Sequence, residues 1–145
     1  MGITYESGGL SRYSLSARKH AELYYEEIRR KKTDFLYIAK NTGFSIEQVQ
    51  AVKYYVFFSK HYLGGNTMSQ RFYPSYEMAE SWRRLSEKGG RHIEQHDVML
   101  IKHELYEMHL LILNPRMSQH TAHELASQKY PYARMADEYY NKRGQ

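Results

Sequence analysis

The stretch from Ile93 to Leu113 constrains the fold more than any other part of the chain. Apolar side chains recur around most of its circumference at helical spacing, and Asn114 and Pro115 close it. A helix that is apolar on most sides usually lies at the centre of a helical protein. The pattern therefore predicts a central helix over 93–113.

Ionisable residues form a stripe on this predicted helix. At 100° per residue, His96, His103 and Glu107 fall within about 40° of one another, and Asp97 and Glu104 lie beside them. Buried ionisable groups have shifted pKa values or need partners, and acid–base chemistry is built in this way. We predict that His96 and His103 share one pocket as an acid–base pair, with Glu104 or Glu107 orienting an imidazole. The alternative is that these are hydrogen-bonded structural residues.

Capping residues and helix breakers divide the rest of the chain into further helices. Ser45 with Gln48 forms a capping box, Gly43 and Gly89-Gly90 end helices, and no alternating strand pattern persists. The expected helices cover 14–32 (capped by Ser14 or Ser16), 34–41, 45–62, 76–88 (capped by Ser75), 118–130 and 132–142. The sequence thus predicts one all-α domain, 14–145, built as a bundle of six or seven helices around the central one. Residues 1–13 are rich in Gly and Ser and are interpreted as a leader or linker.

Composition narrows the classes of site and partner. There is no Cys among the 145 residues, which excludes disulfides and thiolate zinc sites, and no apolar run is long enough for a membrane span. The formal charge is +5, and Arg29, Arg30, Lys31 and Lys32 form a basic cluster at a predicted helix end. This balance favours nucleic acid as a partner, although cations also favour helix C-termini for local reasons. The fifteen Tyr residues are compatible with base stacking and with core packing alike.

Residues 35–57 have the outline of a helix-turn-helix, with small Ala39 at the helix contact and Gly43 in the turn. The outward positions, which include Gln50 and Lys53, are not strongly basic, and the following residues are very apolar. A structural helical hairpin is the better interpretation, and a DNA-binding module is the alternative.

The central helix lacks the His-Glu-x-x-His pattern of zinc hydrolases, because His103-Glu104 is followed by Glu107 and then His109. His103 and Glu107 have the spacing for half of a metal site, with His96 as one further ligand, but nothing fixes the number of ligands. Acid–base chemistry on an RNA 2′-hydroxyl needs only residue types that are present. We therefore expect no metal and no cofactor.

An ordered set of residues resembles a C-terminal module of bacterial polymorphic toxins and of phage minor head proteins of the Mu F type. The similarity covers about residues 14–142. Its members are the run 38–45, Arg71-Phe72, Pro74, Tyr76, Met78, Ala79, Trp82, His96-Asp97, Lys102-His103-Glu104, Met117-Ser118, Ala122-His123, Lys129-Tyr130 and Tyr132.

The resemblance implies a bacterial or phage-encoded nuclease domain, with RNA favoured over DNA, which a larger protein delivers to act in the cytoplasm. Such modules are neutralised by a cognate immunity protein. By position, the resemblance implicates Arg71, His96, Asp97, Lys102, His103, Glu104 and His123. We expect His96, Asp97, His103, Glu104 and Glu107 to be catalytic, and Arg71, Lys102, His123 and the 29–32 cluster to bind substrate. Lys102 lies roughly 100° from the His96/His103 stripe, which places it at the rim. A structural phage or interaction domain without catalysis is a further alternative.

Overall fold

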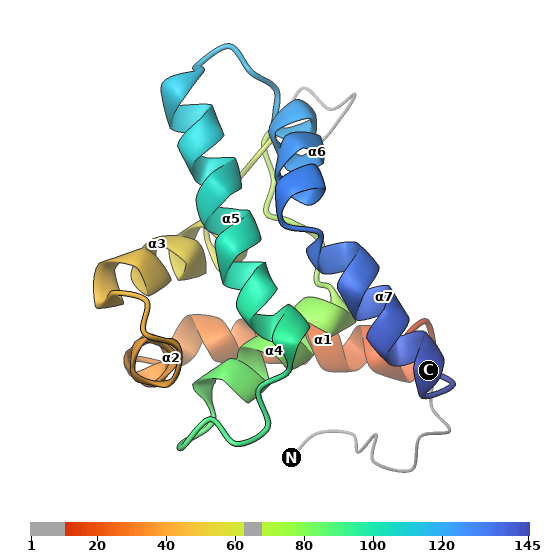
Figure 1. Ribbon diagram of the computed structural model, residues 1–145. Coiled ribbons are helices and arrows are strands. Elements are labelled where there is room, and N and C mark those ends of the chain that lie inside the picture. The colour runs from red at the N-terminus through yellow and green to blue at the C-terminus, as the bar shows by residue number, and fades with distance from the viewer. Residues whose placement is uncertain (1–10, 63–67) are drawn as a thin grey trace.

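The computed structural model describes residues 11–62 and 68–145, and within them the chain forms seven α-helices and no sheet (Figure 1). The helices are α1 (Leu15–Arg30), α2 (Asp34–Thr42), α3 (Ile46–Phe57), α4 (Tyr76–Ser86), α5 (Gln95–Leu113), α6 (Gln119–Lys129) and α7 (Tyr132–Lys142). The predicted all-α class is confirmed. Among the described residues, no helix combines the length and apolar character needed to cross a membrane.

Side-chain caps begin four of these helices. The hydroxyls of Ser14, Ser45, Ser75 and Ser118 each accept a hydrogen bond from the backbone N–H three residues later, at 3.0–3.2 Å. Ser45 and Gln48 complete the predicted capping box. Gly43 ends α2 with a φ of 86°, a left-handed conformation that favours glycine.

Several helices are shorter than the sequence suggested: α4 ends at Ser86 rather than Lys88, α5 begins at Gln95 rather than Ile93, and α1 and α3 end early. Helix α1 ends at Arg30, because Lys31 is extended. Helix α3 ends at Phe57 rather than near Tyr62, because the chain leaves the helix so that His61 pairs with Gln70 through two backbone hydrogen bonds. The strand-like pairing brings 61 and 70–72 against the end of α3.

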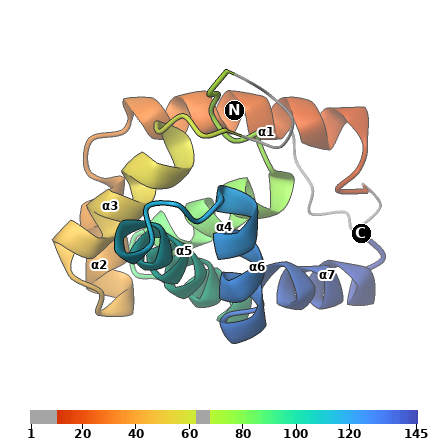
Figure 2. The same ribbon diagram turned by 90° about the horizontal axis from the view of Figure 1, so that it is seen from above.

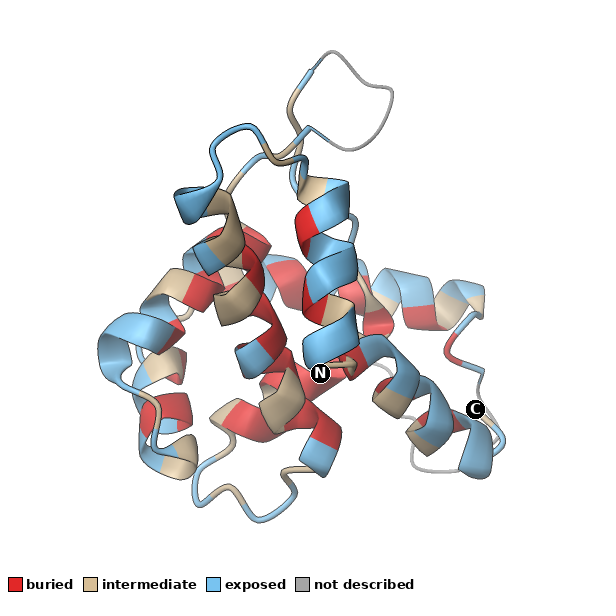
Figure 3. Cartoon of the chain, turned by 45° about the horizontal axis from the view of Figure 1, so that its top comes forward, coloured by how far each residue is buried: buried red, intermediate tan, exposed pale blue. Residues whose placement is uncertain are grey.

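Helix α5 is central, as predicted. It contacts α3, α4, α6 and α7, whereas α1 lies outside α4 and α2 packs on α3 and α4 (Figures 1 and 2). Large buried side chains, Trp82, Tyr25, Phe57, Ile28 and Leu85, fill the space between α1, α3 and α4. Buried residues gather where the helices face one another, and the outer sides of α6 and α7 are mainly exposed (Figure 3).

Arg12 belongs to the folded domain, although it fell within the predicted leader. Its side chain is buried and forms ion pairs with Glu77 at 3.6 Å and Asp137 at 3.0 Å, together with a hydrogen bond to Asn141 at 3.2 Å. The rest of the predicted leader, 1–10, lies outside the described residues.

Candidate active site

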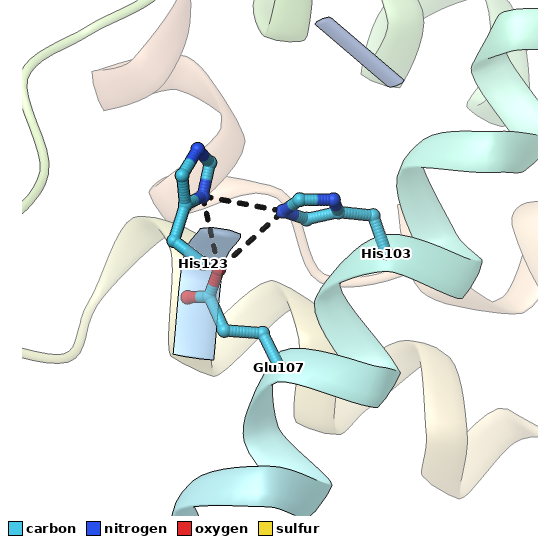
Figure 4. Close-up of side chains that lie close together, drawn as sticks. All are labelled: His103, Glu107 and His123. Atoms are coloured by element: carbon cyan, nitrogen blue, oxygen red, sulfur yellow. Dashed lines mark hydrogen bonds and ion pairs between the residues drawn. The ribbon is translucent and has the colours of Figure 1, made fainter. Parts of the chain in front are cut away.

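Two imidazoles and a carboxylate converge where α5 and α6 lie side by side. His103 and Glu107 are one turn apart on α5, and His123 reaches them from α6 (Figure 4). His103 Nε2 is 3.4 Å from Glu107 Oε1 and 3.3 Å from His123 Nδ1, and His123 Nδ1 is 3.1 Å from Glu107 Oε1. We call these three residues the HEH cluster.

Glu107 is buried, and both of its carboxylate oxygens have partners. Oε2 accepts hydrogen bonds from the Tyr55 hydroxyl and, at 3.0 Å, from Gln119 Nε2, while Oε1 faces the two imidazoles. Burial alone would raise the pKa of this carboxyl, but the hydrogen bonds from the imidazoles, the phenol and the amide outweigh it. The pKa is held well below its usual value, so Glu107 stays ionised.

The Tyr130 carbonyl fixes the orientation of His103. His103 Nδ1 lies 3.1 Å from this backbone oxygen, which can only accept, so Nδ1 carries a proton and donates it. In the neutral ring, Nε2 then presents a lone pair to the HEH cluster. The side chain of His103 is almost fully buried.

His123 is the solvent-facing member of the HEH cluster. Its side chain is 48% exposed, in contrast to the buried His103 and Glu107. The hydrogen bond from Nδ1 to Glu107 raises the pKa of His123. Among the described residues, Nε2 has no hydrogen-bond partner. One imidazole nitrogen is thus held by a buried carboxylate while the other is free.

Glu104 lies outside this hydrogen-bond network, although the sequence placed it beside Glu107. It is buried, and no hydrogen bond to its carboxyl group joins it to another described residue. Burial, and then the charge of Glu107, raise its pKa well above the usual value. Burial therefore favours the uncharged form of Glu104, and this residue does not orient an imidazole.

His96 occupies a different environment, so the predicted shared pocket with His103 is wrong. The guanidinium of Arg84 binds both oxygens of Asp97, at 2.8 and 2.9 Å, and its Nη2 lies 3.2 Å from His96 Nε2. The ring of His96 packs on Tyr139 at 4.6 Å between centroids. Burial lowers the pKa of His96 to about 4, so the neutral ring accepts from Arg84. We call Arg84, His96 and Asp97 the RHD cluster.

The separation follows from helix geometry. Seven residues return a side chain to nearly the same angle but advance it about 10 Å along the axis. At that distance His96 meets α4 and α7, whereas His103 meets α6. Asp97, predicted to be catalytic, is fully buried in a bidentate ion pair.

The predicted substrate-binding cations divide into two groups. Arg29 Nη1 donates to the Phe57 carbonyl at 2.9 Å, and Arg71 Nε donates to the next carbonyl, of Phe58, at 3.4 Å. Neither guanidinium has a carboxylate within 4.0 Å among the described residues. The pKa of Arg29 is lowered, first by burial and second by the nearby charge of Arg71. No sequence pattern indicated that these two residues would meet at the end of α3.

The other predicted cations lie on the surface or in local pairs. Lys31 is 3.6 Å from Glu27, and Arg30 is 4.0 Å from Glu26. Lys32 and Lys102 are exposed, and Lys102 lies off the His103 side of α5 as its helical angle predicts.

The helical hairpin of α2 and α3 forms, but its predicted outward lysine does not face solvent. Lys53 is buried, and its Nζ donates to Asp34 at 2.7 Å and to the Lys31 carbonyl at 2.8 Å. Trp82 donates to the other oxygen of Asp34 at 2.9 Å. Because Lys53 is the one basic residue of α3, this helix presents no free cation.

Sequence reasoning missed four groups that hold the two clusters: Tyr55, Gln119, Arg84 and the Tyr130 carbonyl. The Tyr54-Tyr55 pair was a visible signal, since one member of such a pair is usually buried with its hydroxyl at a polar edge. His123 was expected only to bind substrate, and the structure places it within the HEH cluster.

No protein-family model, curated protein or solved structure matches the chain. The toxin-module resemblance therefore stays a prediction.

Proposed function

We propose that this chain is a nuclease-type effector domain that cleaves RNA by metal-independent acid–base chemistry, with His123 as the proton-transfer group. The observation that carries the proposal is the pairing of a half-exposed imidazole with a buried, ionised carboxylate. Glu107 accepts from Nδ1 of His123, which leaves Nε2 free for substrate. A carboxylate held in this way orients the ring and stabilises the imidazolium that forms when Nε2 takes a proton.

The reaction that suits one exposed imidazole is transphosphorylation. His123 Nε2 accepts the proton of a ribose 2′-hydroxyl as the 2′-oxygen attacks the adjacent phosphorus. The bond between phosphorus and the 5′-oxygen breaks, and the imidazolium returns the proton to the leaving 5′-oxygen. The products are a 2′,3′-cyclic phosphate and a 5′-hydroxyl end. DNA lacks the attacking hydroxyl, so this chemistry selects RNA.

A cationic and aromatic surface at the end of α3 supports a nucleic-acid substrate. Arg29 and Arg71 lie on neighbouring carbonyls, and neither has a carboxylate partner in the part of the chain that the structure describes. Arg29 also lines a shallow hollow of about 340 Å³ with the stacked rings of Tyr54 and Phe58, which lie 5.9 Å apart. Tyr54 is 64% exposed. Guanidinium groups bind phosphates and exposed rings stack on bases, so both parts of a single strand have a complementary surface.

This surface adjoins the HEH cluster through an aromatic bridge. Arg71 precedes Phe72, whose ring packs on Tyr55 at 5.6 Å between centroids. Tyr55 donates to Glu107. Phe72 and Tyr55 thus connect Arg71 to the carboxylate that holds His123.

The resemblance to toxin modules extends this proposal to the biological setting. We propose that a larger bacterial or phage-encoded protein delivers the domain, that it acts in the cytoplasm, and that a cognate immunity protein blocks it. The half-exposed His123 is the surface that such an inhibitor would need to cover.

The test is incubation of the purified chain with end-labelled RNA, with the same sequence as DNA, and with plasmid, each in the presence of a chelator. We expect cleavage of RNA alone, with 2′,3′-cyclic phosphate ends, and its loss in His123→Ala. His120→Ala is the matched control, because His120 is exposed on the same helix and pairs only with Glu124. Binding of duplex DNA without cleavage would instead favour the DNA-binding module, and neither activity would favour a structural domain.

A further inference from the structure

We infer that the HEH cluster is a binding site for a divalent transition metal ion, with Zn²⁺ the best fit. The donor atoms are His103 Nε2, His123 Nδ1 and Glu107 Oε1, and they are separated by 3.1, 3.3 and 3.4 Å. In a tetrahedral zinc site with bonds of about 2.0–2.1 Å, ligand atoms lie about 3.3–3.4 Å apart. The triangle therefore has the size of one face of such a tetrahedron.

The distribution of protons in the HEH cluster supports a cation at its centre. His103 donates its Nδ1 proton to the Tyr130 carbonyl, so Nε2 is the nitrogen that is placed to bind a metal ion in the cluster. Glu107 Oε1 directs a lone pair there, 3.4 Å away. Among the described residues, His123 Nδ1 lies within hydrogen-bond distance of both atoms. A metal ion that replaces the proton on His123 Nδ1 would satisfy all three atoms at once.

The groups around the HEH cluster orient the donor atoms through hydrogen bonds, as the residues around the ligands of a metal site do. Metal-binding imidazoles commonly donate their second N–H to a backbone carbonyl, as His103 does to Tyr130. The second oxygen of Glu107 is fixed by Tyr55 and Gln119. These contacts set the orientation of both α5 ligands before any metal arrives.

The donor set identifies the class of metal and the form of the site. Two imidazoles and one carboxylate suit zinc and its neighbours rather than Mg²⁺ or Ca²⁺, which prefer oxygen ligands. Three protein ligands leave the fourth position for water. The exposure of His123 gives the ion a path from solvent.

This site does not depend on the proposed nuclease activity. Zinc bound to His123 Nδ1 and Glu107 Oε1 would break their hydrogen bond, so metal loading should suppress cleavage by the metal-free route. Zinc binding without any RNA cleavage would contradict the proposed function and leave the metal site intact. RNA cleavage in the presence of a chelator, by a chain that binds no zinc, would support the proposed function and contradict the metal site.

The test is titration of the chelator-treated, dialysed chain with Zn²⁺ by calorimetry, and with Co²⁺ by visible absorption. We expect one ion per chain, a tetrahedral Co²⁺ spectrum, and displacement of Co²⁺ by Zn²⁺. His123→Ala should weaken binding at least about 100-fold, and Tyr55→Phe, which removes an outer hydrogen bond, about 10- to 100-fold.

His120→Ala controls for surface histidines, because it lies on the same helix outside the HEH cluster. Since His123 is half exposed, its truncation should leave the fold intact, and circular dichroism would verify this. Absence of stoichiometric binding, or equal affinity in the His123→Ala variant and the parent, would overturn the inference.

Discussion

Helix α5 contributes one histidine and one carboxylate to each of two clusters, and the clusters differ in what neutralises the carboxylate. In the RHD cluster the partner of Asp97 is Arg84, a permanent cation that binds both oxygens. In the HEH cluster the partners of Glu107 are imidazoles, a phenol and an amide. Asp97 also has an imidazole 3.4 Å away, that of His96, but burial lowers the pKa of His96 to about 4, whereas the hydrogen bond to Glu107 raises the pKa of His123.

Burial separates the two clusters as well. All three RHD side chains are buried, and the ring of His96 is covered by Tyr139 of α7. The HEH cluster opens to solvent at His123. A saturated, closed ion pair stabilises or specifies a fold, whereas an open cluster with a free nitrogen can act on a ligand. The comparison therefore favours a structural role for the RHD cluster, and the proposed chemistry belongs to the HEH cluster.

The largest expected difference between the clusters is in catalysis. His123→Ala should lower RNA cleavage about 10²- to 10⁴-fold, because it removes the proton-transfer group. Its free energy of unfolding should fall by about 1–3 kcal/mol, because the buried carboxylate of Glu107 loses a hydrogen bond, so circular dichroism is needed to verify that the variant is folded. His96→Gln, which keeps an acceptor for Arg84, should cleave at the parental rate. Initial rates on labelled RNA measure both, and a greater loss in His96→Gln would reverse the assignment.

The next effect is on stability. Arg84→Ala should lower the free energy of unfolding by about 3–5 kcal/mol, because Asp97 would be left buried and unpaired. Urea denaturation monitored by circular dichroism measures this change. Arg134→Ala is the control, since its pair with Glu138 is exposed and should contribute under about 1 kcal/mol. Equal effects of the two substitutions would show that the RHD cluster does not stabilise the fold.

A smaller effect concerns pH. The pKa of His96 is lowered to about 4 in the folded state by burial, with Arg84 and Arg143 lowering it further and Asp97 raising it. Between about pH 6.5 and 4 the unfolded chain binds a proton that the folded chain does not. His96 should therefore reduce the free energy of unfolding as pH falls, by at most about 1.4 kcal/mol per unit.

The measurement is the pH dependence of stability in the parent and in His96→Gln. The variant should lose less stability over this window. His123 acts in the opposite sense, because its pKa is raised, and it titrates in both proteins. Parallel pH profiles would show that His96 is protonated equally easily in the folded and unfolded chains.

The smallest effect tests how substrate reaches the open cluster. Arg71→Ala should weaken RNA binding modestly and reduce the magnitude of the salt slope by about 0.7, the value for one phosphate contact on a single strand. Fluorescence anisotropy at several salt concentrations measures both quantities. Arg134→Ala removes an equal charge from α7, and an equal loss of affinity there would indicate diffuse attraction rather than a site at the end of α3.

Much of the fold was predictable, because helix signals are local. Ser45 with Gln48 and the left-handed Gly43 act within a few residues of themselves, and both lie where the pattern placed them. The error at the end of α3 arose from a contact that is distant in sequence. The His61–Gln70 pairing draws the chain out of a helix that its own apolar residues would continue.

The sequence by itself determined that α5 is central and that its ionisable stripe is buried, because periodicity and apolar content fix which side of a helix faces the core. Tertiary structure decided which of those groups meet. A spacing of seven residues specifies the angle between two side chains around the helix axis but not which residues they contact. Because the two positions are about 10 Å apart along that axis, His96 contacts Arg84 and His103 contacts His123. The partners come from α4 and α6, so only the packing of those helices separates the closed cluster from the open one.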